Sequence, residues 1–377
     1  MISCEIAAAY AQCKLKAYRL LTLGEKGIPH EYISILEETT KKNRENYLSR
    51  ITMKIRETKP YSSEEMKNGI TTLLDANFSF GDLEAYADIL TLAEINASQL
   101  SRVYIPTIVI GTHKISKSQK LLLGFSGYVL SKLQNKTVVW GTIIGRETVP
   151  HTIKLEPLYK EIESSLIIMR KWLDSPPSES PSIILNNHCP LCPFFKACEA
   201  KCIESDHLSL LNTISTRKQI AKFERKGIFT VNQLSYLYRP RRQRKRSRKP
   251  PSIQHSIELQ ALVLRLGKIY LHSPPELVRK NTKLFLDFEG IPDSKCFYLI
   301  GLLVCGENDS THYSFWANTI NDEQHIWQQL VSKLGEYKDC PIYHYGSYEA
   351  KAIAELGRRY GSDAQAILNR LINVNSF

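Results

Sequence analysis

Two groups of residues in this chain have the types and spacings of metal-binding sites. Cys189, Cys192 and Cys198 form a C-x2-C-x5-C pattern in a turn-rich segment, with a proline after each of the first two. Thiolates at this spacing hold zinc or an iron–sulfur cluster once a fourth ligand completes the set. Asp287 and Glu289 form the second group, a pair of carboxylates two residues apart. Carboxylate oxygens bind hard divalent cations such as Mg²⁺.

Cys13 is the best candidate for the fourth thiol of the first group. Apolar residues recur around it at helical spacing, which places Cys13 on the buried face of an N-terminal helix. If Cys13, near the start of the domain, and the three cysteines near its end bound the same metal centre, they would hold the two ends of the domain together. Two alternatives stay open. Cys13 can be an ordinary core residue, because buried cysteines are common in protein cores. Cys202, just beyond the pattern, can be one of the ligands in place of Cys198.

The paired carboxylates lie in an apolar segment, 284–290, that alternates as a strand does. Side chains two residues apart on a strand share a face, so Asp287 and Glu289 are placed to chelate one or two Mg²⁺ ions. After this first strand we expect strands at 297–304 and 311–316, a helix at 322–334, a strand at 341–345 and a helix at 348–360. Three strands, a helix, a strand and a helix follow one another in the RNase H-like fold, so the order of these elements resembles that fold.

Glu349 is the third carboxylate that we expect at this site. It follows the fourth expected strand and lies in the first turn of the next helix. The D-x-E pattern resembles the first motif of the DEDD 3′-to-5′ exonucleases, which implies that Asp287, Glu289 and Glu349 are catalytic and bind Mg²⁺ or Mn²⁺. A structural alternative for Glu349 is an acidic residue that complements the helix dipole. Because the chain ends at Phe377, we expect a further strand and a third acidic motif to be missing.

The first 205 residues contain a second acidic pattern. The segment 80–90 alternates and places Asp82, Glu84 and Asp88 on one face of an expected strand. Aligned carboxylates can bind a divalent ion, and they can equally form the solvated side of a half-buried strand. The other elements that we expect in this core are strands at 104–110 and 137–144 and a helix at 121–133.

The cysteine pattern carries a resemblance to a known group of enzymes. The segment 10–16, followed far downstream by C-x2-C-x5-C, resembles the RecB-like nucleases with an iron–sulfur staple, among them CRISPR-associated exonucleases. The resemblance implies a restriction-endonuclease-like fold of the PD-(D/E)xK type. It also implies a [4Fe-4S] cluster, with structural Zn²⁺ as the alternative. The implied ligands are Cys13, Cys189, Cys192 and Cys198.

The nuclease motif of that family is incomplete in this chain. In the family, an Asp on one strand and a D/E-x-K on the next bind Mg²⁺. Asp88 corresponds to the first acid and Lys114 to the lysine, but Thr112 stands where the second acid belongs. Because a hard cation needs anionic oxygen ligands, we expect a catalytically degenerate site. The domain would then bind DNA and hold the cluster.

A strongly basic run follows two short expected helices that begin at Thr216 and Thr230. The glycine turn between these helices resembles the helix-hairpin-helix, which contacts DNA backbones, and a plain helical connector is the alternative. The run has eight cations in eleven residues, a density that binds phosphates through counterion release. Its expected nucleic-acid-binding residues are Arg239, Arg241, Arg242, Arg244, Lys245, Arg246, Arg248 and Lys249.

Composition narrows the class of protein. A net charge of +12 favours a polyanionic partner, and we expect nucleic acid, DNA in preference to RNA, with a helicase or repair partner left open. Nine cysteines, four or five of them clustered, do not indicate a secreted disulfide framework in 377 residues. The sequence shows no signal peptide and no apolar run of membrane-spanning length, so we expect a cytoplasmic protein without membrane contact.

The chain contains, in order, a domain with the four cysteines, a helical connector, a basic run and a domain with the D-x-E pair. This order resembles a family of bacterial RecB-like nucleases with a C-terminal RNase H-like exonuclease domain. We expect an α/β protein with a restriction-endonuclease-like domain at 1–205, a helical connector and basic linker at 206–281, and a partial RNase H-like domain at 282–377. The expected activity is that of a metal-dependent nuclease of the 3′-to-5′ exonuclease type. The alternative is a nucleic-acid-binding protein without turnover, or a fragment of a larger nuclease.

Overall fold

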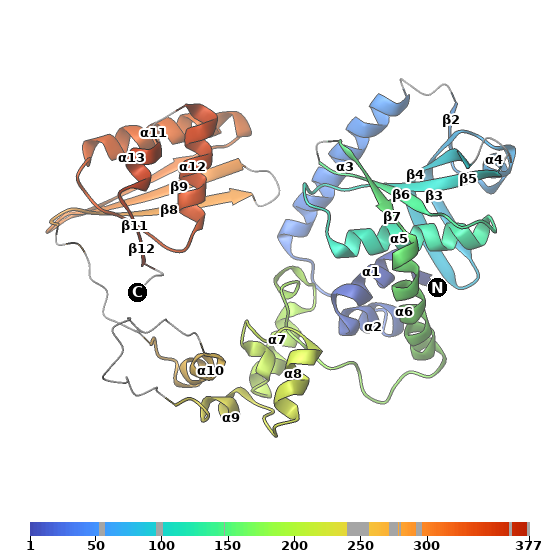
Figure 1. Cartoon of the computed structure of the whole chain (residues 1–377), viewed down its shortest axis with the longest axis horizontal. Helices are drawn as coiled ribbons and strands as arrows, with labels where there is room; N and C mark the ends of the chain where they lie inside the picture. The colour runs from blue at the N-terminus through green and yellow to red at the C-terminus, as the bar shows by residue number, and fades with distance from the viewer. Residues whose placement is uncertain are drawn as a thin grey trace, which may run out of the picture. The chain divides into compact units, whose positions relative to one another are not determined.

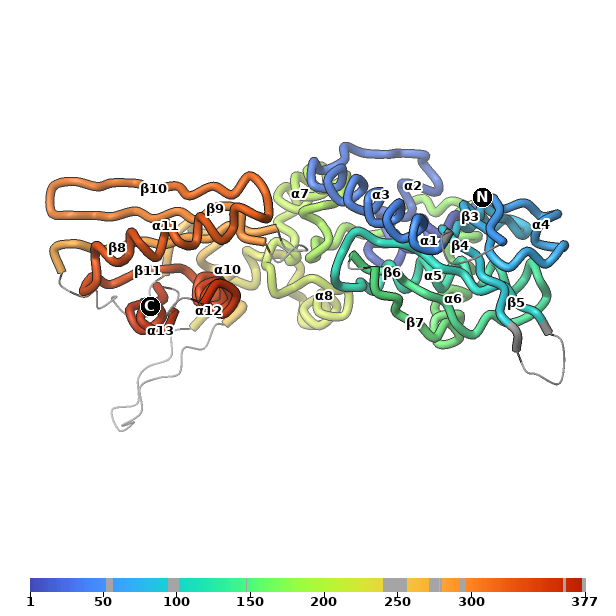
Figure 2. The backbone as a smooth tube through the Cα atoms, turned by 90° about the horizontal axis from the view of Figure 1, so that it is seen from above, coloured from blue at the N-terminus to red at the C-terminus, as the bar shows by residue number. Residues whose placement is uncertain are grey.

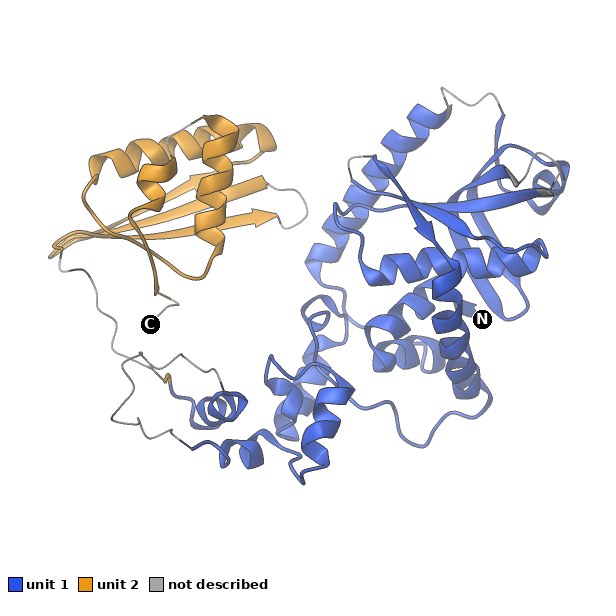
Figure 3. Ribbon diagram, viewed as in Figure 1, with its two compact units in different colours: residues 1–268 blue, residues 269–377 orange. Residues whose placement is uncertain are grey.

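The computed structural model describes residues 1–52, 57–95, 101–146, 148–239, 256–270, 278, 280–291, 296–361 and 364–374 of the chain. The chain is drawn as a ribbon in Figure 1 and as a backbone tube in Figure 2. It forms two compact units, residues 1–268 and residues 269–377 (Figure 3). The first unit contains a seven-stranded sheet and a separate helical region, and the second contains a five-stranded sheet.

The sheet of the first unit is built from a meander and a helical crossover. Strands β3 (Thr72–Phe80), β4 (Leu83–Ile95) and β5 (Ser101–Val109) are antiparallel neighbours, and β6 (Trp140–Ile144) lies parallel to β5. Helix α5 (Lys117–Leu133) makes the connection from β5 to β6, because parallel neighbours cannot be joined by a tight turn. The remaining strands are β1 (Ile2–Ser3), which pairs with β4, β2 (Thr58–Pro60) and β7 (Pro150–Lys154).

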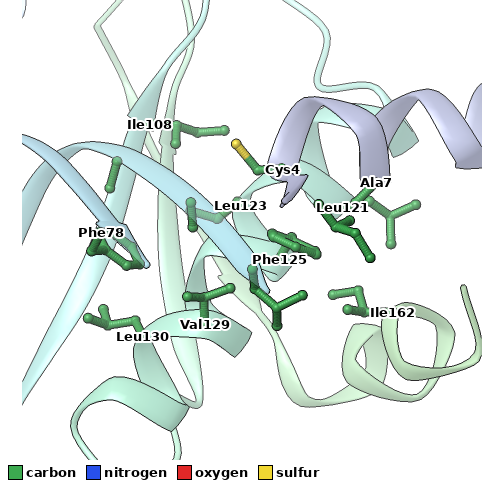
Figure 4. Packing of buried hydrophobic residues seen from close by; sticks show 14 of the residues in the cluster. Cys4, Ala7, Phe78, Ile108, Leu121, Leu123, Phe125, Val129, Leu130 and Ile162 are labelled. Carbon is green, nitrogen blue, oxygen red and sulfur yellow. The ribbon is translucent and has the colours of Figure 1, made fainter. Parts of the chain in front are cut away.

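Helix α5 lies at the centre of the first core. A capping box between Ser116 and Gln119 closes its N-terminus. Phe125 is fully buried in the core, where it lies among side chains from the sheet, from α1 (Cys4–Gln12) and from α6 (Glu156–Asp174) (Figure 4). A Cβ added at Gly124 would come within 2.9 Å of Leu158, so this glycine lets α5 and α6 pack closely.

The N-terminal helix that we expected around Cys13 is broken in the structure. Helix α1 ends at Gln12 and α2 (Lys14–Thr22) begins after Cys13, whose backbone is extended with φ −161° and ψ 121°. Cys13 is therefore half-buried at a helix junction instead of lying on the buried face of one helix. Two further helices of this unit are α3 (Glu31–Thr52) and α4 (Ser63–Asn68). Within the described ranges, no helix has the length and apolar character needed to cross a bilayer.

The helical region of the first unit has a small core of its own. The helix starts expected at Thr216 and Thr230 are present, each with a capping box to the glutamine three residues later. Gly227 supplies the left-handed turn between these helices, with φ +74°. The elements of the region are η1 (Cys189–Leu191), α7 (Phe195–Glu204), η2 (Leu208–Leu210), α8 (Arg217–Glu224), α9 (Val231–Ser235) and α10 (Ile257–Leu266).

The sheet of the second unit has the strand order β10-β9-β8-β11-β12. Its first three strands in sequence are antiparallel neighbours, whereas the last two are added in parallel on the other side of β8. Figure 1 shows the helices of this unit on one face of the sheet. The elements are β8 (Lys283–Ile291), β9 (Cys296–Cys305), β10 (Ser310–Trp316), η3 (Ile320–Asp322), α11 (Glu323–Glu336), β11 (Ile342–His344), α12 (Tyr348–Tyr360), α13 (Ala364–Leu368) and β12 (Leu371–Asn373).

Strand β12 corrects one expectation. We expected no strand after α12, but Leu371–Asn373 pairs in parallel with Ile342–His344. A strand of three residues has too few positions for alternation to be recognised in the sequence. The sheet of the second unit therefore has its fifth strand within this chain.

A fully buried carboxylate ties α12 to the sheet. Glu323 accepts hydrogen bonds from the Phe297 amide at 2.8 Å and from the Tyr360 hydroxyl at 2.6 Å, and it pairs with the Arg359 guanidinium. These contacts join the start of α11, the start of β9 and the end of α12. Glu323 therefore fixes the position of the helix whose first turn carries Glu349.

Replacing Glu323 with Ala is expected to destabilise the second unit by about 2 to 3 kcal/mol, because the buried amide and hydroxyl lose their acceptor and Arg359 loses a buried partner. Glu355→Ala is the matched control. Glu355 also pairs with Arg359, at 2.7 Å, but its side chain is 35% exposed, so its loss should cost less than about 1 kcal/mol. Urea-dependent hydrogen exchange of second-unit peptides measures both, and equal losses would contradict the prediction.

Candidate metal centres

Asp287 and Glu289 lie on the open face of the second sheet. Strand β8 alternates buried and exposed side chains along its length. Leu286 and Phe288 are buried in the core beneath the helices, so Asp287 and Glu289 point to the opposite face and are both exposed. Because side chains alternate along a strand, the burial of one face of β8 leaves these two carboxylates side by side on the other face.

The two carboxylates open onto a cavity of about 350 Å³ that is continuous with solvent. In the sheet register Asp287 is opposite Gly301, and Gly301 is opposite Ser314 on the next strand. Because Gly301 has no side chain, the space between Asp287 and Ser314 is free, and a Cβ there would still be 3.9 Å from the His312 ring. The cavity is lined by Phe285, Leu286, Asp287, Glu289, Leu299, Gly301, Leu303, His312 and Ser314.

Glu349 does not line this cavity. It is buried in the first turn of α12, with Oε2 3.2 Å from Nδ1 of His344. This separation is within the range of a hydrogen bond between the two buried side chains. Sequence reasoning left His344 unassigned, although a histidine at the end of a buried strand and five residues before an acid was a usable signal.

Tyr348 connects Glu349 to the β8 carboxylates. Burial, and then the charges of Glu289 and Glu349, raise the pKa of Tyr348. Its hydroxyl lies over Gly290, where an added Cβ would come within 2.5 Å of it. The Tyr348 hydroxyl therefore lies at the Gly290 end of β8, and Glu349, the next residue in the chain, faces His344. Sequence reasoning missed both Tyr348 and Gly290.

The donor set at the open face fits a hard divalent cation. Mg²⁺ prefers oxygen ligands, keeps several waters and is commonly bound by one or two carboxylates together with substrate phosphates. Asp287 and Glu289 supply two carboxylates, and Ser314 adds a hydroxyl on the cavity wall. Across the residues that the structure describes, no three His, Cys, Asp or Glu side chains are grouped so as to hold a metal ion by themselves. Water and substrate would have to complete the shell.

Asp88, the expected acid of the first unit, is occupied by protein donors. Its carboxylate accepts hydrogen bonds from Arg44 Nε at 2.6 Å, from the Val109 amide at 2.7 Å and from the Tyr86 hydroxyl. Lys114 is exposed in the loop after β5 and is not among these partners. An arginine therefore lies where a metal ion would have to bind.

The acidic face expected at 80–90 is formed only in part, because Glu84 and Asp88 share a face of β4 but Asp82 precedes the strand. Gly81 and Asp82 form the turn between β3 and β4, and Asp82 pairs with Arg170 at 2.8 Å. Glu84 is exposed, whereas Asp88 is buried. The alternation of residue types runs across the turn and conceals it. Gly81, with φ +60°, was the signal that could have revealed it.

The cysteine group is brought together in the first unit. Cys13 comes from the α1–α2 junction, Cys189 from η1, Cys192 from the residue directly after η1, and Cys198 from α7. They line one narrow cavity of about 20 Å³ that is partly open to solvent. Its apolar lining is Leu15, Ile183, Ile184, Leu185, Phe194 and Phe195. The four thiols that line it are those of Cys13, Cys189, Cys192 and Cys198.

Cys202 lies apart from this cavity. Its sulfur is buried 3.8 Å from the Ser209 hydroxyl, and it does not line the cavity, whereas Cys198 does. The pKa of Cys198 is raised to about 11, chiefly by burial; Arg19 lowers it, and the neighbouring thiols of Cys13, Cys192 and Cys189 contribute to the rise. Thiols are the ligands that hold Zn²⁺ or an iron–sulfur cluster, and a cation in this cavity would stabilise the charged thiolates. As they lie here, however, the four cysteines do not form a group that could hold a single metal ion.

Comparison with known families agrees with the strand order of the second unit. Residues 284–375 match the family model of the RNase H superfamily. The second unit is therefore RNase H-like. At the level of this superfamily, the match indicates hydrolysis of nucleic acid by a nuclease-type activity. No curated protein matches the chain.

Proposed function

We propose that this chain is a metal-dependent nuclease of the 3′-to-5′ exonuclease type, with its active site on the open face of the second unit. The observation that carries the proposal is the D-x-E pair on β8, the central strand of an RNase H-like sheet, at the wall of an open cavity. Asp287 and Glu289 would hold Mg²⁺ or Mn²⁺, with Glu349 as the third carboxylate at this end of β8.

The residues around the pair suit a phosphodiester substrate. When bound, the divalent ion supplies a Lewis acid for a phosphoryl oxygen and lowers the pKa of a bound water. Gly301 leaves room for the substrate backbone beside Asp287, and His312 and Ser314 can hydrogen-bond phosphate oxygens from β10. His344 holds the Glu349 carboxylate at the start of α12.

A nuclease assay tests this proposal. Single- and double-stranded DNA and RNA, labelled at either end, are incubated with the protein and Mg²⁺ or Mn²⁺. We expect divalent-dependent release of nucleotides from 3′ ends, DNA in preference to RNA. The absence of cleavage with either ion would favour the second candidate, a nucleic-acid-binding protein without turnover. The contact of Glu349 with His344, outside the cavity of the β8 pair, is the observation that favours this candidate.

For the first unit we propose a DNA-binding role on a restriction-endonuclease-like, RecB-type fold. The β3-β4-β5 meander, the α5 crossover and the parallel β6 support this fold, and the occupation of Asp88 by Arg44 supports the absence of catalysis there. We also propose that its four cavity-lining cysteines hold a [4Fe-4S] cluster, with Zn²⁺ as the alternative.

The basic run is proposed as a nucleic-acid contact. Arg239 is exposed, and the other seven cations of the run lie outside the described residues. Replacing Arg241, Arg242, Arg244 and Arg246 with Gln should weaken binding equally for all sequences. The slope of log K against log salt should become shallower by about 0.7 to 0.9 for each phosphate that the variant no longer neutralises.

Fluorescence anisotropy with labelled DNA at several salt concentrations measures this slope. The matched control replaces four exposed, scattered lysines with Gln, which removes the same charge without touching the run. These lysines are Lys132, Lys160, Lys171 and Lys201. Equal slopes for the two variants would show that only net charge matters and would contradict the prediction.

A further inference from the structure

Two cations line the cysteine cavity together with the four thiols. Lys16 and Arg19 lie on α2, one helical turn apart, and both are cavity-lining residues. Helix α2 begins directly after Cys13, so the same short segment supplies one thiol and both positive charges. The rest of the lining, apart from His188, is apolar or cysteine.

Lys16 is held in place by two hydrogen bonds. Its Nζ lies 2.9 Å from Gln12 Oε1 and 3.0 Å from His188 Nε2. A protonated lysine only donates, so Nε2 of His188 is the acceptor and the ring is neutral. Lys16 lines the same cavity as the thiols of Cys13 and Cys192.

Arg19 lies on the Cys198 side of the cavity. Its guanidinium is stacked 5.1 Å from the centre of the Phe194 ring, and Glu25 lies 3.8 Å from its Nε. Arg19 and the Cys198 thiol line the same cavity. The Arg19 side chain is 14% exposed, whereas that of Glu25 is 46% exposed, so water screens Glu25 more strongly.

Formal charges explain why such a site needs these two residues. Four thiolates around a dipositive centre, either Zn²⁺ or an oxidised [4Fe-4S] core, leave a net charge of about −2. An uncompensated charge is costly in an apolar cavity. We propose that Lys16 and Arg19 are the charge-compensating residues of this metal centre, which retain the metal and, for a cluster, raise its reduction potential. This inference rests on the proposed cysteine site.

The test uses the full chain, purified without oxygen, as wild type and as Lys16→Met and Arg19→Gln. Lys14→Met is the matched control, because Lys14 is also on α2 but lies over the Tyr10 ring and lines a different cavity. Iron, sulfide and zinc per chain are measured, together with the rate of metal release to a chelator. Each variant should release metal about 10 to 100 times faster than wild type, as expected for outer-shell partners.

Lys16→Arg should restore slow release, and Lys14→Met should match wild type. If iron is present, Lys16→Met and Arg19→Gln should also lower the midpoint potential of the cluster. Wild-type release rates and potentials in both variants would overturn the inference and leave the cysteine site standing. A wild-type chain without iron or zinc would overturn the cysteine site itself. If Lys16→Met fails to fold, Arg19→Gln carries the test.

Discussion

Replacing Asp287 with Asn, or Glu289 with Gln, is expected to reduce nucleic-acid cleavage by at least about 1,000-fold. Each substitution keeps the size of the side chain but removes an anionic ligand and the charge that retains the divalent ion. Both side chains are exposed on β8, so the second unit should fold as in wild type. The measurement is the initial rate of 3′-end release at saturating Mn²⁺, with folding checked by hydrogen exchange of second-unit peptides.

Asp88→Asn is the matched variant that shows which of the two units contains the active site. Asp88 pairs with Arg44, so this substitution should destabilise the first unit, but the cleavage rate per folded chain should stay close to that of wild type. Cleavage that survives Asp287→Asn and disappears in Asp88→Asn would contradict the assignment and place the active site in the first unit.

The second large effect is expected at the cysteines. Cys189→Ser or Cys192→Ser should abolish metal binding and unfold the cysteine-lined part of the first unit. Metal-binding free energy at such sites is folding free energy, about 10 kcal/mol or more for structural zinc. Wild-type protein purified without oxygen should be brown and contain iron and sulfide. Metal analysis and thermal unfolding of each variant measure the two losses.

Cys202→Ser is the matched control for the cysteine variants. Its sulfur faces Ser209 and does not line the cavity, so this variant should keep its metal and lose only packing energy. Zinc without iron in the wild type would replace the cluster by a zinc site. A stable wild-type protein without either metal would contradict both forms of the proposal.

Local signals in the sequence predicted the elements that position these sites. The alternation in β8 was recognisable because one face of that strand is buried and the other is open, which imposes a period of two. The helix starts at Thr216 and Thr230 were recognisable because capping is a contact between residues three apart. The cysteine spacing was recognisable because three of the thiols lie within one short segment.

Contacts between distant residues were not predictable in this way. Arg44 reaches Asp88 across 44 positions, and no local pattern in the sequence joins them. Glu349 contacts His344 and does not line the cavity of the β8 pair, an arrangement that depends on how α12 packs on the sheet. The break at Cys13 also escaped prediction, since the apolar spacing continues through both helices.

Calorimetric titration of the full chain with Mn²⁺ is the most direct test of where the catalytic ion binds. We expect binding to the wild type, loss of that binding in Asp287→Asn and unchanged binding in Asp88→Asn. Binding that is retained in Asp287→Asn but abolished in Asp88→Asn would contradict the proposal that the carboxylates of β8 hold the metal.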